Sequence, residues 1–264
     1  MNGLITPYVL GLYNRIETVT LTRKLRGIAK NLAIQILHLT APRFRMLSSE
    51  WNVRALTLDG KQTFCGYYDL SPFSETENEL LVHVAQNHAA PKTDNITLGL
   101  YDLASATLTP LCTTKSWGWQ IGARLGWLSR KHRLVIANTN DKRGSNSTIW
   151  QISSGNVTIH KELYLPLFAW SYQAGLGSNL NFHRLEHFRP GYGFEKGGVQ
   201  NCHLKAPSDD GVFVVDMKTN TSELIVSLAE MAEVTRKAPE ASSYINHQAW
   251  NPAGTRLLFF VINT

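Results

Sequence analysis

The residues of this sequence best suited to chemistry are aromatic, His, Arg, Asp and Gln residues placed just before apolar, strand-like runs. Tyr68 and Asp69 stand in "FCGYYDLSPFS", and His247 and Gln248 stand in "INHQAWNPAGTRLLFF". Aromatic faces stack on sugar rings, while an Arg together with Asp or Gln can hold hydroxyl and carboxylate groups. We therefore expect these positions to bind a ligand. The predicted binding residues are Tyr68, Asp69, Trp119, Gln120, Arg124, Arg184, Arg189, His247 and Gln248.

The segment "SNLNFHRLEHFRPGYGF" concentrates basic and aromatic side chains. Strand alternation would put Phe182 and Arg184 on one face and His183 on the other. Arg184 and Arg189 could then clamp an anion. The structural alternative is an ion pair with a nearby acidic residue, which would be Glu186, Asp209 or Asp210. In the same way, the Trp and Tyr candidates could pack between sheets instead of meeting a ligand.

The elements that must position these residues repeat along the chain. "WLSRKHRLVIAN" from Trp127 and "WNPAGTRLLFFV" from Trp250 share a Trp, an Arg at the sixth following position, and then an apolar strand. A second element follows, with a tight polar turn between two strands, as in "LGLYDLASATLTPL" and "GVFVVDMKTNTSELIVSL". Each unit then holds about four strands at a spacing of roughly 45 to 60 residues. The pattern predicts an all-β protein, a β-propeller of four-stranded blades, rather than a β-sandwich.

The chain divides into two parts in this interpretation. Residues 1–50 form a basic amphipathic helical segment, in which Leu21, Leu25, Ile28 and Leu32 recur at helical spacing. This helix could pack on the main domain or lie on a membrane surface as a peripheral contact. Residues 51–264 form a partial propeller of about three and a half blades, and we expect this array to be incomplete.

The blade-like motifs carry a family resemblance. "FCGYYDLSPFS", "WGWQIGARLGWL", "SNLNFHRLEHFRPGYGF", "DDGVFVVDMKTN" and "INHQAWNPAGTRLLFF" resemble the blades of bacterial TolB-like, WD-repeat-like propellers, and most of all those near polysaccharide and glycosyltransferase genes. More distantly, the motifs are similar to oligogalacturonate lyase. The lyase resemblance implies manganese-assisted β-elimination on an acidic sugar, with His and Gln ligands, a His base and an Arg nearby. His247 is the residue that falls onto a metal-ligand position of that family.

We therefore expect a carbohydrate-binding or scaffold propeller of bacterial surface-polysaccharide metabolism, with an acidic oligo- or polysaccharide as partner and no obligatory cofactor. One alternative is a lyase of the oligogalacturonate type, which would use manganese. Another is a platform for a protein partner, because fold alone does not decide between these functions.

The composition limits which partners and which cellular compartment we expect. The formal net charge of +6 favours acidic partners, but much of the excess lies near the N-terminus, and we expect no nucleic-acid partner. The three cysteines, Cys65, Cys112 and Cys202, are far apart in the sequence. This spacing favours free thiols in a reducing compartment over a disulfide framework. Together with the lack of a secretion signal, this predicts a cytoplasmic protein. The sequence holds no phosphate-binding loop, dinucleotide fingerprint or GxSxG nucleophile motif.

Overall fold

The computed structural model describes residues 56, 58, 60–86, 94–153, 156–194, 203–236 and 238–264. All of these belong to one compact unit, Ala55–Thr264. The predicted N-terminal helical segment, residues 1–50, lies outside the described residues, and its role at a membrane surface stays a prediction.

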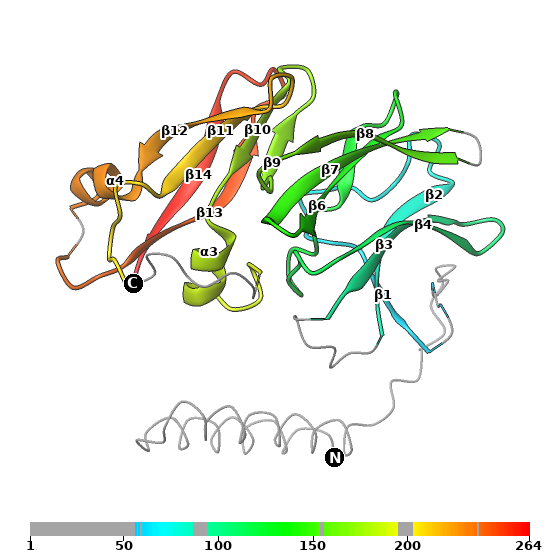
Figure 1. The fold of residues 1–264 in the computed structure, drawn as a ribbon, viewed down its shortest axis with the longest axis horizontal. Coiled ribbons are helices and arrows are strands. Elements are labelled where there is room, and N and C mark those ends of the chain that lie inside the picture. The colour runs from blue at the N-terminus through cyan, green and yellow to red at the C-terminus, as the bar shows by residue number, and fades with distance from the viewer. Residues whose placement is uncertain are drawn as a thin grey trace, which may run out of the picture. The chain divides into compact units, whose positions relative to one another are not determined.

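The described chain is mainly β and folds into successive antiparallel sheets, in which neighbouring strands follow one another along the sequence (Figure 1). The first sheet consists of β1 (Gln62–Phe64), β2 (Glu79–Ala85), β3 (Ile96–Asp102) and β4 (Thr107–Thr114). The second consists of β5 (Gly126–Ser129), β6 (Leu134–Asp141), β7 (Gly144–Ser153) and β8 (Asn156–Leu163). The third consists of β9 (Ala169–Ser171), β10 (Leu176–Asn179), β11 (Gly211–Asp216) and β12 (Thr221–Ser227). The last pairs β13 (Ser243–Trp250) with β14 (Leu257–Asn263).

Burial along the strands explains their sequences. The second strand of the first sheet, β2, is buried at every position after Glu79, and accordingly it is almost continuously apolar. The fourth strands, β4 and β8, are largely exposed and hold many polar residues. Each of the first three sheets is therefore a four-stranded meander with covered central strands and a solvated outer strand. This architecture is consistent with propeller blades.

The outer hairpins of the first and third sheets use the same local device. The Asp102 carboxylate accepts hydrogen bonds from the backbone amides of Ala104 and Ser105, at 3.0 and 2.7 Å. Asp216 does the same for Lys218 and Thr219 in the third sheet. An Asp at this position caps the turn through its own side chain, so the turn is determined locally. The sequence repeat at these hairpins is confirmed.

The two Trp–Arg motifs occupy equivalent hairpins. Trp127 lies in β5 and pairs with Val135 of β6, while Trp250 ends β13 and pairs with Leu257 of β14. In each hairpin the motif's Arg directly precedes the second strand. This part of the predicted repeat is also confirmed.

Tryptophans also link successive sheets. The Trp127 indole Nε1 donates to the carbonyl oxygen of Pro72, which precedes β2 of the first sheet, at 3.0 Å. The Trp170 indole of β9 donates in turn to the carbonyl oxygen of Trp127, at 3.4 Å. Gly126 allows this approach, because a Cβ at this position would lie 2.8 Å from the Trp170 ring. The sheets therefore pack on one another in sequence order.

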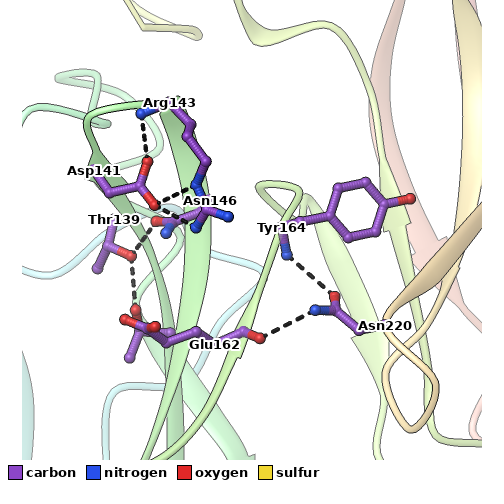
Figure 2. A network of polar contacts seen from close by, with 8 residues as sticks. Thr139, Asp141, Arg143, Asn146, Glu162, Tyr164 and Asn220 are labelled. Atoms are coloured by element: carbon purple, nitrogen blue, oxygen red, sulfur yellow. Dashed lines mark hydrogen bonds and ion pairs between the residues drawn. The ribbon is translucent and has the colours of Figure 1, made fainter.

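A polar seam joins the outer part of the second sheet to the third (Figure 2). The Asn220 side chain accepts from the backbone amide of Tyr164 at 3.1 Å and donates to the carbonyl oxygen of Glu162 at 3.3 Å. Asn220 has a φ of 59°, a left-handed conformation that Asn tolerates better than most residues. The Tyr164 hydroxyl also bonds the hydroxyl of Ser222. The turn between β11 and β12 is thus held against β8.

The segment after β10 is a helix, not the strand expected from its alternation. Here α3 (Phe182–Phe188) begins at Asn181, whose side chain accepts from the Arg184 amide at 2.9 Å. This N-cap starts the helix and brings Arg184 and Phe188 to the same side, four residues apart. A second short helix, α4 (Leu228–Val234), begins with a capping box between Ser227 and Glu230. Among the described residues, no helix is long and apolar enough to cross a membrane.

Candidate binding site

Four ring side chains from three separate segments of the chain meet in one cluster. The Tyr67 ring lies 4.3 Å from Tyr68, 5.9 Å from Tyr192 and 5.6 Å from His247, measured between centroids. The Tyr67 and His247 rings are stacked, with an interplanar angle of 24°. Tyr67 and Tyr68 follow β1, Tyr192 follows α3, and His247 lies within β13. We call this set of four residues the aromatic cluster.

A β-bulge directs His247 into the cluster. The register of β13 against β14 shifts between Asn246 and Gln248, so that His247 has no direct partner across the strand pair. Its φ is 46°, and its backbone amide donates to the Asn246 side-chain oxygen at 2.8 Å. Bulges of this kind re-aim a side chain from the alternation of a regular strand.

Tyr68 is the accessible member of the aromatic cluster. Its side chain is 84% exposed, whereas Tyr67 and Tyr192 are partly buried. Because so little of this ring is buried, it contributes little to the stability of the fold. It is therefore free to stack on a ligand.

Arg124 and Asp69 form a bidentate ion pair beside the aromatic cluster. The two guanidinium nitrogens of Arg124 donate to the two Asp69 carboxylate oxygens at 2.9 and 2.8 Å. Arg124 is 1% exposed, donates through Nε to the Phe168 carbonyl oxygen at 2.7 Å and lies over the Phe168 ring. Since its donors are taken, Arg124 serves the structure, while the Asp69 side chain keeps 33% exposure and remains accessible to a hydroxyl group.

Arg189 is a basic residue beside the aromatic cluster. Its guanidinium lies 3.9 Å from the centroid of the Tyr192 ring, a cation–π contact. Within the part of the chain that the structure describes, this guanidinium makes no hydrogen bond or ion pair. As far as the described residues go, the site therefore presents a positive charge on an aromatic surface without an acidic partner.

Gln120 borders the same region through its backbone. Its amide donates to the Gly191 carbonyl oxygen at 3.1 Å, next to Tyr192, and its side chain is exposed. Trp119, by contrast, packs in the core formed by the first two sheets, near Phe64 and Trp117.

Protonation states follow from burial and from the neighbouring charges. Burial lowers the pKa of His247, and the positive charges of Arg189 and Arg124 lower it further, against an opposing effect of Asp69. His247 is accordingly a neutral base at pH 7. Burial raises the pKa of Tyr67 to about 12, with added effects from the phenols of Tyr192 and Tyr68, so Tyr67 stays protonated.

Arg184 and Gln248, like Trp119, lie away from the site, so three of the nine predicted residues lie elsewhere. Arg184 is 1% exposed, and its donors reach backbone carbonyl oxygens, that of Ser243 among them at 2.6 Å. Gln248 is 2% exposed and donates to the Asn179 carbonyl oxygen at 3.2 Å. The predicted alternative of an ion pair for Arg189 is not seen among the described residues. For Arg184, burial raises the pKa of Asp210, while the positive charge of Arg184 acts to lower it.

The structure therefore brings together Tyr68, Asp69, Arg124, Arg189 and His247 of the predicted residues, with Gln120 at the border. Tyr67 and Tyr192 stand in the motifs that the sequence analysis singled out, but they are not in its list of predicted binding residues. Tyr67 stands beside Tyr68 in the same motif, so the motif could have indicated it. Tyr192 reaches the site only because the chain turns back after α3, which no spacing in the sequence shows.

The residues around His247 do not fit the manganese ion that the lyase resemblance implies. Across the described ranges, no three His, Cys, Asp or Glu side chains gather in a way that could hold a metal. His247 instead faces the rings of Tyr67, Tyr192 and Phe260. Asp69, the acidic group that acts on it, is held by Arg124.

A cavity of about 510 Å³ lies away from the aromatic cluster, in the seam between the first two sheets. Apolar side chains of Leu100, Ile152 and Val157 line it together with the ion pair of Arg133 and Glu79. Because that pair is already bidentate, at 2.8 and 3.1 Å, the cavity offers no free charge. The aromatic cluster is the stronger candidate for a binding site.

Comparisons with known proteins give little beyond this geometry. No protein-family model matches the chain, and no curated protein matches its sequence. A similar solved structure is that of oligogalacturonate lyase in complex with manganese, with 11% sequence identity and a TM-score of 0.32. The match covers 79% of this chain and 62% of the lyase chain, so the chain spans less than two thirds of that protein's length. A likeness of this degree assigns neither activity nor substrate.

Proposed function

We propose that this protein is a β-propeller-type binding protein that takes an acidic carbohydrate at the aromatic cluster, in the cytoplasmic part of bacterial surface-polysaccharide metabolism. The observation that supports it most is the guanidinium of Arg189, which lies over Tyr192 and has no hydrogen bond or ion pair within the described residues, in a cluster that also holds the exposed ring of Tyr68. An aromatic face next to an unpaired cation suits a sugar ring that bears a carboxylate. The Asp69 carboxylate adds an acceptor for a sugar hydroxyl group.

The binding test compares an acidic and a neutral trisaccharide. Calorimetry on the full chain at low salt should show tighter binding of trigalacturonate than of maltotriose. Added salt should reduce the difference, since a single contact of this kind is screened by ions. Equal affinity for the two sugars would contradict the proposal.

Replacement of Arg189 by Ala should weaken trigalacturonate binding about fivefold, roughly 1 kcal/mol for an accessible charge contact. The melting temperature should hardly change, because Arg189 makes no hydrogen bond or ion pair through its side chain within the described chain. The Arg256→Ala variant is the matched control, since Arg256 is exposed and lies outside the aromatic cluster. A loss of binding in both variants would point to net charge and not to this site.

One observation favours a lyase as the second candidate function. His247 is a neutral base next to the positive charge of Arg189, and such a pair could remove a proton next to a carboxylate and balance the charge that develops. Ultraviolet absorbance of an unsaturated uronate product would reveal the reaction. A His247→Gln variant that retains the full rate would exclude His247 as the base.

A further inference from the structure

The turn that bears Arg189 and Tyr192 is fixed by contacts from outside the aromatic cluster. After α3 the chain turns at residues 189–193, with the Tyr192 amide donating to the Arg189 carbonyl oxygen at 3.2 Å. Gly191 has a φ of 101°, which only glycine adopts without strain. At Gly193 a Cβ would lie 2.0 Å from the Phe182 carbonyl oxygen, so the turn packs directly on the start of the helix.

One carboxylate oxygen holds both of these glycines. Oε2 of Glu186 accepts from the Gly191 amide at 2.8 Å and from the Gly193 amide at 3.1 Å. From the other side, the Gln120 amide bonds the Gly191 carbonyl oxygen. Hydrogen bonds to a charged acceptor are among the stronger ones in proteins. Glu186 therefore closes the turn around Tyr192 from the middle of α3.

We infer that Glu186 is a positioning residue of the binding site: by holding the amides of Gly191 and Gly193, it sets the Arg189–Tyr192 pair against His247. This inference rests on the proposed carbohydrate site. Without the two hydrogen bonds, a turn with two glycines has many conformations. Ligand binding would then have to order the Arg189 guanidinium and the Tyr192 ring, and the conformational entropy lost in doing so would weaken the affinity. In this proposal Glu186 acts on the ligand only through the turn.

Two substitutions separate the reach of the Glu186 side chain from its charge. Glu186→Gln keeps an acceptor oxygen at the same length and removes the charge. Glu186→Asp keeps the charge but withdraws the oxygens by about 1.5 Å, beyond hydrogen-bond reach of the glycine amides. If Glu186 acts by position, Gln should preserve the site and Asp should impair it.

The first measurement is amide hydrogen exchange of Gly191 and Gly193 in the full chain without ligand. We expect exchange about tenfold faster in Glu186→Asp and within about threefold of the wild type in Glu186→Gln. The second is calorimetry with trigalacturonate, in which Glu186→Asp should bind about tenfold more weakly and Glu186→Gln about as well as the wild type. The opposite order of the two variants, equal loss in both, or no change in either would overturn the inference.

The two measurements also separate this inference from the proposed function. If the wild type fails to bind trigalacturonate, the carbohydrate proposal falls. The exchange rates of the two glycine amides still decide whether Glu186 holds the turn, because they are measured without a ligand.

Discussion

The Arg184→Met variant should be less stable than the wild type by about 3 kcal/mol, because the buried Ser243 carbonyl oxygen and two further backbone carbonyl oxygens lose the donor that Arg184 supplies. Arg184 donates to the Ser243 carbonyl oxygen at 2.6 Å and to those of Leu204 and Lys205 at 2.8 and 3.0 Å. It also lies over the Phe188 ring, so one side chain ties α3, the chain before β11 and the start of β13 together. Met fills much of the volume but cannot donate a hydrogen bond.

Thermal unfolding should report this change as a melting temperature lower by roughly 5–10 °C. The Arg256→Met variant removes the same charge from an exposed position and should melt within about 2 °C of the wild type. An Arg184→Met protein that keeps the wild-type melting temperature but loses trigalacturonate binding would restore the role in ligand binding that the sequence suggested.

Acidification should destabilise the protein through His83 before the carboxylates respond. His83 is 1% exposed, and burial lowers its pKa to about 4 from an ordinary value of 6.5. Its Nε2 accepts from the Ala123 amide at 3.0 Å, and Nδ1 lies 3.3 Å from the Phe64 carbonyl oxygen. The ring therefore joins the first sheet to the loop before β5 as a neutral imidazole with a proton on Nδ1.

The sign of the pH effect follows from the lowered pKa. Between pH 6.5 and 4 the unfolded chain binds a proton at His83 that the folded chain does not, so the free energy of unfolding falls as the pH falls through this range. The full difference corresponds to about 3 kcal/mol, and above pH 6.5 the effect is absent. His183 and His247 have lowered pKa values as well and act in the same direction.

Urea unfolding of the full chain between pH 7 and 4 measures this dependence. The His83→Gln variant should lose most of the slope, because it cannot take up the proton, although it should be less stable at pH 7. The His160→Gln variant replaces an exposed histidine and should keep the wild-type slope. A His83→Gln protein with an unchanged slope would contradict the assignment.

Some features of this protein were predictable because they are local. The hairpin turns at Asp102 and Asp216 depend on a side chain that bonds the amides two and three residues on, so a short window of sequence contains the whole cause. The Trp–Arg motifs recur at equivalent hairpins, and together these signals predicted antiparallel four-stranded units. The predicted strand at Phe182 was wrong. The N-cap at Asn181 is an equally local signal for a helix, but the period-two alternation was given more weight.

The candidate site was only partly predictable. Tyr68 and Asp69 were found because exposed aromatic and acidic residues before a strand are a recognisable pattern. Tyr192 belongs to a segment that the sequence analysis singled out but was not in the list of binding residues, and the bulge at His247 is not marked in the sequence by a glycine. Both positions depend on how separate sheets approach one another.

Arg184 and Arg189 show best what the sequence determined and what only the tertiary structure decided. Sequence alone identified both as basic residues in a segment rich in aromatic side chains, able to bind an anion or to form an ion pair. The partner that fixes Arg184 is the Ser243 carbonyl oxygen, 59 positions further along the chain. Arg189 lies past the end of the same helix, where its guanidinium lies over the Tyr192 ring and has no hydrogen bond or ion pair with any other residue that the structure describes. Burial of a charge is set by the surfaces that fold over it, and those surfaces come from distant strands, so Arg184 is structural, whereas Arg189 is the one that we propose for ligand binding.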